Sequence, residues 1–351
     1  MPEPVALGGS VLGGAAPPIV VAEMSGNHNG RLDRALEIVT AAARAGARAL
    51  KLQTYAPDTM TLDVPDGDFI IADPRSPWHG QTLYGLYREA HTPWEWHKLI
   101  FDRCRELGLL AFSAAFDATA VDFLERLDVP CHKIASFENT DLPLIRKAAS
   151  TGKPLIISTG MATLGEIEEA VRTAHDAGCR DVILLKCTSS YPAAPDESHV
   201  RTIPHMRELF DCHVGLSDHT PGIGVGVAAV ALGAVLVEKH LTLSRADGGV
   251  DAAFSLEPDE MRALVVEAER AWRALGGLRY GPTPGEQPSV VFRRSLYVAE
   301  DMAAGDVFTP RNLRIVRPGH GLPPKYYDVL LGKRVRKNVA KGTRVTWDLI
   351  E

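Results

Sequence analysis

Polar and ionisable side chains follow a series of short apolar runs, each at the point where its run ends. They comprise carboxylates, lysines, hydroxyls and two histidines: Glu23, Lys51, Gln53, Ser113, Lys133, Ser136, Glu138, Ser158, Thr188, Ser189, Tyr191, Ser217, His219, Glu238 and His240. Lysines and hydroxyls that converge on one place can hold a phosphate or carboxylate through charge-assisted hydrogen bonds. Two histidines with carboxylates nearby can hold a divalent cation. The set therefore predicts an anion site beside a metal site.

The apolar runs themselves predict eight buried strands. They lie at residues 19–22, 49–52, 109–113, 132–134, 155–157, 182–185, 213–216 and 236–237. Most are separated by an amphipathic helical stretch, such as residues 32–43 before Gly46. Parallel strands covered by helices lose the polar–apolar alternation of half-exposed strands. Eight such β-α units predict a (β/α)8 TIM barrel, in which the active site lies at the C-terminal ends of the strands.

A doubly wound open sheet is the rival fold. No G-x-G-x-x-G or Walker sequence follows the first run, so nothing positive supports it.

The composition, 45% apolar and 23% charged residues in 351, is ordinary for a globular protein and excludes disorder and fibrous structure. No apolar run approaches the ~18 residues of a membrane helix, and the start of the chain lacks signal-peptide features, so we expect a cytoplasmic protein. Five scattered cysteines without C-x-x-C spacing suggest neither a disulfide framework nor a thiolate zinc site.

The chain divides into four parts by composition. We expect a disordered or frayed N-terminus over residues 1–17, the barrel over 18–275, a Gly/Pro-rich linker over 276–289 and a small β-rich domain over 290–351. Within the barrel, residues 55–93 form one long interval rich in aromatic residues and proline, which predicts a lid or substrate wall over the barrel mouth.

The C-terminal part has two features of its own. The pattern Asp-x3-Gly-x3-Thr-x3-Leu from Asp301 is echoed by Asn-x3-Gly-x3-Thr-x3-Ile from Asn338, a displacement of 37 residues, which predicts pseudo-symmetry. From Val290 onward twelve Lys and Arg stand against six Asp and Glu, although the whole chain has a net charge of -6. The charges are spread without aromatic stacking partners, so docking onto an acidic surface of this chain or a partner subunit explains them better than nucleic-acid binding.

Motifs on seven of the eight strands resemble the sialic acid synthase family. They are residues 23–30 (EMSGNHNG), 51–54 (KLQT), 133–136 (KIAS), 157–162 (ISTGMA), 187–192 (CTSSYP), 215–220 (GLSDHT) and 238–240 (EKH). The tail, with residues 293–296 (RRSL) and 317–319 (RPG), looks like that family's antifreeze-like (SAF) domain. Within the family, residues 84–87 (YGLY), 90–97 (AHTPWEWH), 136–138 (SFE) and 245–249 (RADGG) look most like the pseudaminic acid synthases.

The resemblance implies metal-dependent condensation of phosphoenolpyruvate with 2,4-diacetamido-2,4,6-trideoxy-L-altrose, giving a nine-carbon 2-keto acid and phosphate. It implies four catalytic residues, Glu23, Glu138, His219 and His240, of which the two histidines would hold Mn²⁺ or Mg²⁺. Phosphoenolpyruvate would be bound by Lys51, Lys133, Ser136, Ser158, Ser189 and Ser217. The sugar would be bound by Glu23, Gln53, Phe116, Tyr191, Asp251 and Arg317. A homodimer with exchanged SAF domains would bring Arg317 to the partner's sugar.

Two departures from the family pattern stand out. Residues 113–116 read SAAF where Ser-(Ser/Thr)-Pro-Phe is usual, so one phosphate-binding hydroxyl and one proline are missing. Asn139 stands where an aliphatic residue is more usual, and the sequence offers no reason for it. Three readings stay open: this synthase, a neuraminate or legionaminate synthase that differs only in the sugar, and a non-catalytic carbohydrate-binding barrel.

Overall fold

The computed structural model describes residues 2–351, and these form two compact units. One ends at Gly276 and the other spans Gly277–Glu351. The division falls at the start of the Gly/Pro-rich stretch that the sequence marks as a linker. The four-part scheme of the sequence analysis remains our proposal for the domain limits, except at the N-terminus, where the structure differs.

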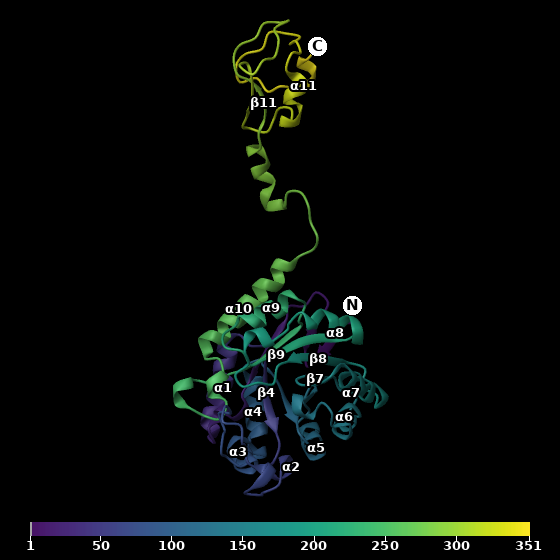
Figure 1. Ribbon diagram of the computed structural model, residues 1–351, viewed down its shortest axis with the longest axis vertical. Helices are drawn as coiled ribbons and strands as arrows, with labels where there is room; N and C mark the ends of the chain where they lie inside the picture. The colour runs from purple at the N-terminus through teal and green to yellow at the C-terminus, as the bar shows by residue number, and fades with distance from the viewer. Residues whose placement is uncertain (1) are drawn as a thin grey trace. The chain divides into compact units, whose positions relative to one another are not determined.

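A closed barrel of eight parallel strands forms the core of the first unit, in the order β10-β3-β4-β5-β6-β7-β8-β9 (Figure 1). The predicted TIM barrel is thereby confirmed. Each strand contains or overlaps the corresponding apolar run: β3 Ile19–Glu23, β4 Ala49–Thr54, β5 Leu110–Ala115, β6 His132–Ile134, β7 Leu155–Ser158, β8 Val182–Cys187, β9 His213–Asp218 and β10 Leu236–His240.

Helices surround the barrel and bury apolar side chains against the strands; most are amphipathic, whereas α9, residues 224–231, is apolar on all sides. The covering helices are α1 Leu32–Ala45, α4 Trp94–Glu106, α5 Ala118–Arg126, α6 Leu142–Ala149, α7 Leu164–Asp176, α8 Thr202–Phe210, α9 Gly224–Ala231 and α10 Pro258–Leu275. Local signals set their ends. The Asp117 carboxylate caps α5 by accepting from the amides of Thr119 and Ala120, and α1 ends where Gly46 takes a φ of 85°.

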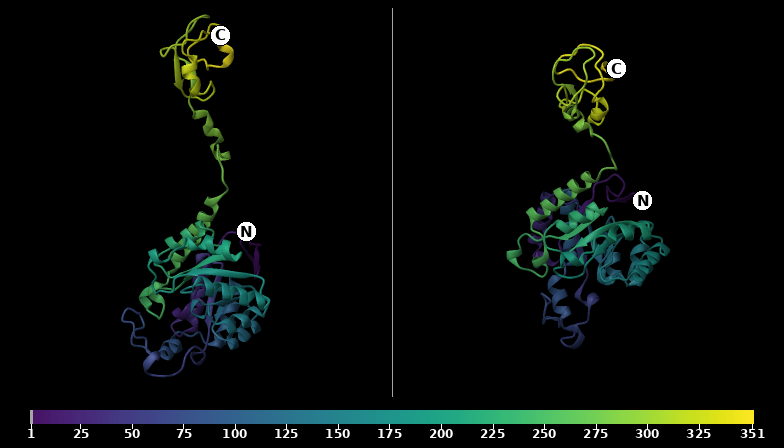
Figure 2. Two further views of the ribbon diagram at one scale, coloured as in Figure 1. Left: turned by 45° about the vertical axis from the view of Figure 1, so that its right-hand side comes forward. Right: turned by 45° about the horizontal axis from the view of Figure 1, so that its top comes forward.

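Short helical turns occupy the loops at the barrel mouth. They are η1 Ser25–His28, α2 Pro57–Met60, η2 Gly67–Phe69, α3 Leu83–Ala90, η3 Ser136–Glu138, η4 Pro195–Glu197, η5 Arg245–Asp247 and η6 Ala252–Phe254. The segment between β4 and α4 projects beyond the ring of helices, as Figure 2 shows in blue. It leaves from the C-terminal end of β4, as the predicted lid requires.

The prediction of a frayed segment over residues 1–17 is wrong for residues 5–12, which form a hairpin, and residue 1 lies outside the described residues. β1 Val5–Leu7 and β2 Ser10–Leu12 form an antiparallel hairpin, turned by two glycines with positive φ at positions 8 and 9. Leu7 and Leu12 are fully buried in a cluster with Phe112 and Ile156 of the barrel interior. The glycines that suggested fraying instead form the turn, and the hairpin closes the N-terminal end of the barrel.

The second unit is pseudo-symmetric, as its sequence repeat predicts. The backbones of Met302 and Val339, which are 37 residues apart, exchange two hydrogen bonds of 2.9 Å. Asp301 accepts a hydrogen bond from the amide of Lys341, and Asn338 accepts one from the amide of Ala304. The unit begins with η7 Pro284–Phe292, which has no buried residue. The other elements, β11 Ser295–Val298, β12 Leu313–Val316, η8 Pro324–Tyr326, α11 Tyr327–Leu330 and η9 Trp347–Leu349, surround an apolar core of their own.

Across residues 2–351, none of the helices combines the length and the apolar character needed to cross a bilayer.

We expect the hairpin to contribute to barrel stability. Leu7→Ala should lower the free energy of unfolding by ~2 to 5 kcal/mol, because it opens a cavity in a fully buried cluster. Val11→Ala is the matched control: it lies in the same hairpin but is 48% exposed, so it should cost less than about 0.5 kcal/mol. Urea unfolding followed by tryptophan fluorescence measures both. Equal small losses in the two variants would contradict a packed hairpin.

Candidate active site

The inward-facing side chains at the C-terminal ends of the barrel strands lie side by side around the barrel mouth. Alternate residues of a strand face the same side, so Glu238 and His240 both point into the barrel. In the strand register His240 lies opposite Glu23, and Glu23 lies opposite Lys51. Glu238 also lies opposite Ser217 on the neighbouring strand. Parallel pairing therefore places these functional groups side by side around one mouth.

Four buried charges form the centre of the mouth. The Nζ atom of Lys51 lies 2.9 Å from Glu23 Oε2 and 3.4 Å from Glu238 Oε1. Lys133 Nζ lies 3.5 Å from the same Glu238 oxygen, which also accepts a hydrogen bond of 3.3 Å from the Ser217 hydroxyl. All four charged residues are at most 5% exposed. Two lysines and two carboxylates thus pair with one another in a buried site.

The two carboxylates of this cluster differ in their proton affinity. Burial raises the pKa of Glu23 to about 7, although Lys51 opposes the shift. Burial also acts to raise the pKa of Glu238, but Lys133 and Lys51 together outweigh it and hold that pKa below its usual value. The two lysines also differ: against the effect of burial, Glu23 and Glu238 hold the pKa of Lys51 above its usual value, whereas burial lowers the pKa of Lys133. Such a cluster favours the binding of an additional anion.

Hydroxyl groups from three further loops meet beside the lysines. The Ser136 hydroxyl accepts a hydrogen bond of 3.2 Å from the amide of Gly160, and Ser158 has a fully buried hydroxyl with no hydrogen-bond partner. A Cβ atom on Gly160 would come within 2.1 Å of the Ser189 hydroxyl and 2.7 Å of the Ser136 hydroxyl. Only glycine allows this close approach. Ser136 and Ser189, two of the serines predicted to bind phosphoenolpyruvate, are therefore neighbours in space.

The two histidines predicted to hold a metal lie next to each other, with ring centroids 5.3 Å apart. His219 donates its Nδ1–H to the carbonyl oxygen of Thr188 over 3.0 Å, which leaves Nε2 as the nitrogen that can bind a cation. His240 has a buried Nδ1 without a hydrogen-bond partner. Burial lowers the pKa of His240 well below its usual value, so this ring is neutral, as a ligand must be.

This donor set fits a divalent cation only as a two-histidine site. Within residues 2–351, no three His, Cys, Asp or Glu side chains lie close enough to form a complete protein cage for a metal. A cation held here would need further ligands from water or substrate, which is typical of catalytic sites.

Glu138 lies in η3 at the edge of the same mouth. Its Oε2 atom is buried and has no hydrogen-bond partner. Burial raises the pKa of this carboxyl to about 7, with Lys133 opposing the shift. A carboxyl group with such a pKa can accept and release a proton at neutral pH.

Aromatic side chains line one side of the mouth. Tyr191 packs against His219, Phe254 and Trp78, with ring centroids 4.6, 5.2 and 5.9 Å apart. Trp78 comes from the projecting segment and donates its indole N–H to the carbonyl oxygen of Val250 over 3.0 Å. The segment therefore contributes a wall to the site, as the sequence predicts.

A second group of rings extends this wall. The ring centroid of Phe116 lies 5.2 Å from that of Tyr55, which in turn lies 5.9 Å from that of Tyr87.

Gln53 donates a hydrogen bond of 3.1 Å to Glu23 Oε1 and so joins the charged cluster. Ser113 does not join the mouth: its hydroxyl lies 2.6 Å from that of Thr54, which has a buried histidine as its other partner.

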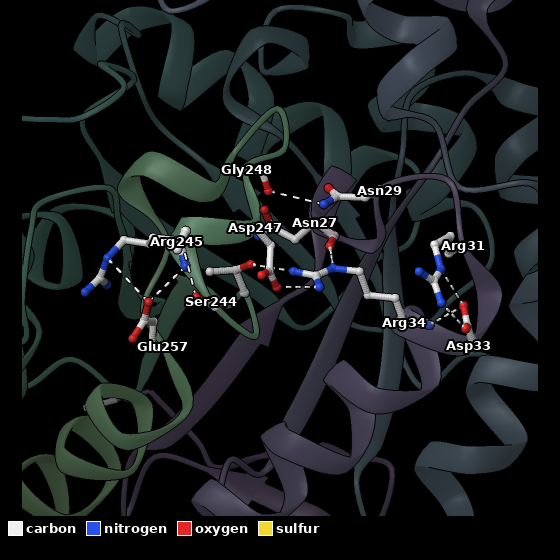
Figure 3. A network of polar contacts seen from close by, with 12 residues as sticks. Asn27, Asn29, Arg31, Asp33, Arg34, Ser244, Arg245, Asp247, Gly248 and Glu257 are labelled. Carbon is white, nitrogen blue, oxygen red and sulfur yellow. Dashed lines mark hydrogen bonds and ion pairs between the residues drawn. The ribbon is translucent and has the colours of Figure 1, made fainter.

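Asp251 is carried by the loop after β10, and several contacts fix this loop (Figure 3). Arg34 bridges two segments, because it donates to the carbonyl oxygen of Asn27 over 2.9 Å and to the Asp247 carboxylate over 2.7 Å. Asn29 donates to the carbonyl oxygen of Gly248 over 3.2 Å. Asp251 itself accepts a short hydrogen bond from the Ser25 hydroxyl. The loop that presents Asp251 is thus tied to the loop after β3.

A buried ion pair outside the barrel interior fixes both histidines. Lys239 precedes His240, and its Nζ lies 2.7 Å from Asp218 Oδ2 and donates to the carbonyl oxygen of Thr220. Asp218 also accepts from the amide and the hydroxyl of Thr220 over 2.9 and 2.7 Å. The residues on either side of His219 are therefore bound to the residue before His240.

Sequence reasoning named Glu238 only among the carboxylates near the histidines, and it did not foresee that Glu238 is the shared partner of both lysines. Arg317 belongs to the second unit, at a cis Arg317–Pro318 bond. Its assignment to the sugar remains a prediction.

Comparisons with known proteins give a consistent result. Residues 38–280 match the NeuB family and residues 293–351 match the SAF domain. The chain is 42% identical over 323 residues to a pseudaminic acid synthase of Campylobacter jejuni, covering 92% of this chain and 94% of that protein. It is 39% identical to a pseudaminic acid synthase of Helicobacter pylori, and the match covers 95% of this chain and 98% of that protein. An N-acetylneuraminic acid synthetase of Leptospira borgpetersenii, solved with citrate, is 31% identical and superposes with a TM-score of 0.73, covering 83% and 96%.

Proposed function

The chain belongs to the NeuB family and carries a SAF domain, and from this premise we propose that it condenses phosphoenolpyruvate with 2,4-diacetamido-2,4,6-trideoxy-L-altrose, as a pseudaminic acid synthase. The observation that carries the proposal is the meeting of two buried lysines, a group of serine hydroxyls and a pair of histidines at one barrel mouth. The lysines and the serine hydroxyls fit an anionic phosphate ester. The histidine pair fits a cation that polarises a carbonyl group.

Phosphoenolpyruvate would bind with its negative groups toward Lys51 and Lys133. Glu238 already balances part of their charge, and the buried, unpartnered Ser158 hydroxyl is free to donate to a phosphate or carboxylate oxygen. Ser136, Ser189 and Ser217 add further hydroxyls from the neighbouring strand ends.

His219 and His240 would hold Mn²⁺ or Mg²⁺, which when bound supplies Lewis-acid polarisation of the sugar aldehyde. The fit rests on the unpartnered nitrogen of His240 and on the orientation of His219 by the Thr188 carbonyl. The Lys239–Asp218 ion pair fixes the backbone positions that carry His240 and His219.

The reaction forms one carbon–carbon bond and, at carbon 2, replaces the carbon–oxygen bond to phosphate by one to the oxygen of water. Carbon 3 of phosphoenolpyruvate attacks the aldehyde carbon, and the aldehyde oxygen takes a proton and becomes a hydroxyl. Water then adds at carbon 2 and gives a proton to Glu138, whose pKa near 7 allows it to act as the base. Phosphate leaves with the oxygen of the breaking bond and takes up the remaining proton of the added hydroxyl, and carbon 2 becomes the keto group.

The aromatic wall supports a deoxy sugar. The proposed substrate carries a methyl group where mannosamine derivatives carry a hydroxymethyl group, and it has a second acetamido group. Trp78, Tyr191 and Phe254 offer apolar surface for these groups, while Gln53 and Asp251 offer polar partners at the mouth. A neuraminate or legionaminate synthase would share the chemistry and differ in this wall.

The assembly is a further part of the proposal. A homodimer with exchanged SAF domains would let Arg317 donate to an acetamido carbonyl of the partner's sugar. The acidic charge of the body and the basic charge of the tail support such an exchange.

Purified protein should release phosphate from phosphoenolpyruvate only when the diacetamido sugar is present. Mass spectrometry should identify the nine-carbon 2-keto acid. An apolar pocket discriminates by ~10- to 200-fold per group, so weak activity with N-acetylmannosamine is compatible with the proposal. Preference for the neuraminate or legionaminate substrate would contradict the sugar assignment, and absence of phosphate release with every sugar would favour a non-catalytic barrel.

Removal of one imidazole should abolish metal-dependent turnover. We expect His219→Ala and His240→Ala each to weaken Mn²⁺ binding by about 100-fold or more, measured by calorimetry, and to lose activity as chelator-treated enzyme does. His205→Ala, an exposed histidine on α8, is the matched control and should behave as wild type. Unchanged metal affinity in both mouth variants would refute the two-histidine site.

The role of Glu138 as the base should be visible in the pH dependence of kcat. The wild-type kcat should fall as the pH drops below about 7, because Glu138 then takes up a proton and cannot accept another. Glu138→Gln should lower kcat by ~10²- to 10⁴-fold and remove this fall. Glu23 has a similar pKa, so Glu23→Gln is measured in parallel. If the kcat of Glu23→Gln no longer decreases at low pH while that of Glu138→Gln still does, Glu23 is the base.

A further inference from the structure

Asn139 links two loops of the barrel mouth. It follows η3 directly and is only 5% exposed. Its Nδ2 lies 3.0 Å from the carbonyl oxygen of Gly160 and 3.4 Å from that of Ser158. Both partners can only accept hydrogen bonds, so the amide nitrogen, and not the amide oxygen, must face them. One buried side chain from the loop after β6 thus holds both ends of the turn after β7.

The turn that Asn139 holds is fixed on its other sides as well. Thr159 donates both its amide and its hydroxyl to the carbonyl oxygen of Leu185, over 2.9 and 3.1 Å. The Gly160 amide donates to the Ser136 hydroxyl in the loop that carries Asn139. Two hydrogen-bond links therefore join the loops after β6 and β7: one made by the Ser136 hydroxyl and one made by the Asn139 amide.

These links meet at the hydroxyls of the anion site. Ser158 and Ser136 belong to the two loops that Asn139 connects, and a Cβ on Gly160 would collide with both Ser136 and Ser189. The spacing of the three serines is thus set by where the Ser158–Gly160 turn lies. An aliphatic side chain at position 139 could fill the same space but could not donate to either carbonyl oxygen.

We propose that Asn139 is a positioning residue for phosphoenolpyruvate: its amide sets the distance between the Ser136 and Ser158 hydroxyls that bind the anion. This inference rests on the proposed function, because it takes these serines as the binding groups. Asn139 itself does not contact the reacting atoms. Its effect should therefore appear in the affinity for phosphoenolpyruvate and not in the affinity for the sugar.

The test replaces the amide while keeping the volume of the side chain. Asn139→Leu should raise the Kd for phosphoenolpyruvate, measured by calorimetry without sugar, and the KM for it about tenfold. The KM for the sugar should stay within about twofold. Asn139→Ala adds no bulk and serves as a second variant should the leucine variant fold poorly. Thermal melting of each variant shows that folded protein is compared.

A matched control and a double variant separate positioning from general destabilisation. Thr151→Val removes a hydrogen bond of 2.7 Å to the Ala148 carbonyl oxygen at the opposite end of β7, and it should leave the Kd for phosphoenolpyruvate unchanged. If Asn139 acts through Ser136, the double variant Ser136→Ala/Asn139→Leu should lose less affinity than the product of the two single losses.

The possible failures can be told apart. Wild-type protein that binds no phosphoenolpyruvate and releases no phosphate would contradict the proposed function. Active wild-type protein with unchanged affinity in folded Asn139→Leu or Asn139→Ala would overturn this inference alone. Equal loss of affinity for phosphoenolpyruvate and sugar, or strictly multiplicative losses in the double variant, would also overturn it.

Discussion

The burial of four charges in the barrel mouth is the constraint on which the rest of the structure depends. Removing an ion from water costs several kcal/mol, and the cost is recovered only with good geometry and further hydrogen bonds. Glu23, Lys51, Lys133 and Glu238 meet this demand because they come from neighbouring or facing strands of one closed barrel. The strand register that pairs Glu23 with Lys51 is therefore a condition of stability as well as of chemistry.

The same constraint explains why supporting contacts surround the site. A buried group keeps its position only if its neighbours cannot move, so each functional loop is tied to the next. Lys239 and Asp218 fix the histidines from the outer side of the barrel, and Arg34 and Asn29 fix the loop of Asp251 (Figure 3). The site is thus organised before any substrate enters, which reduces the reorganisation that the reaction requires.

Most of the fold could be predicted from the sequence, because eight apolar runs with helical stretches between them allow few architectures. The strand-end residues could be grouped for the same reason. The hairpin at the N-terminus was missed because its two strands have three residues each and its glycines are equally typical of a frayed segment. Asn139 could not be explained, since its partners are backbone carbonyls of another loop, and such contacts leave no pattern in the side-chain sequence.

The hairpin seals one end of the barrel. Leu7 and Leu12 close the N-terminal end together with the packed interior, so the barrel opens at one end only. Substrates and products must then use the same opening at the C-terminal ends of the strands. The anion-binding groups lie at the strand ends, with the aromatic wall beside them, so released phosphate shares its exit with the sugar acid.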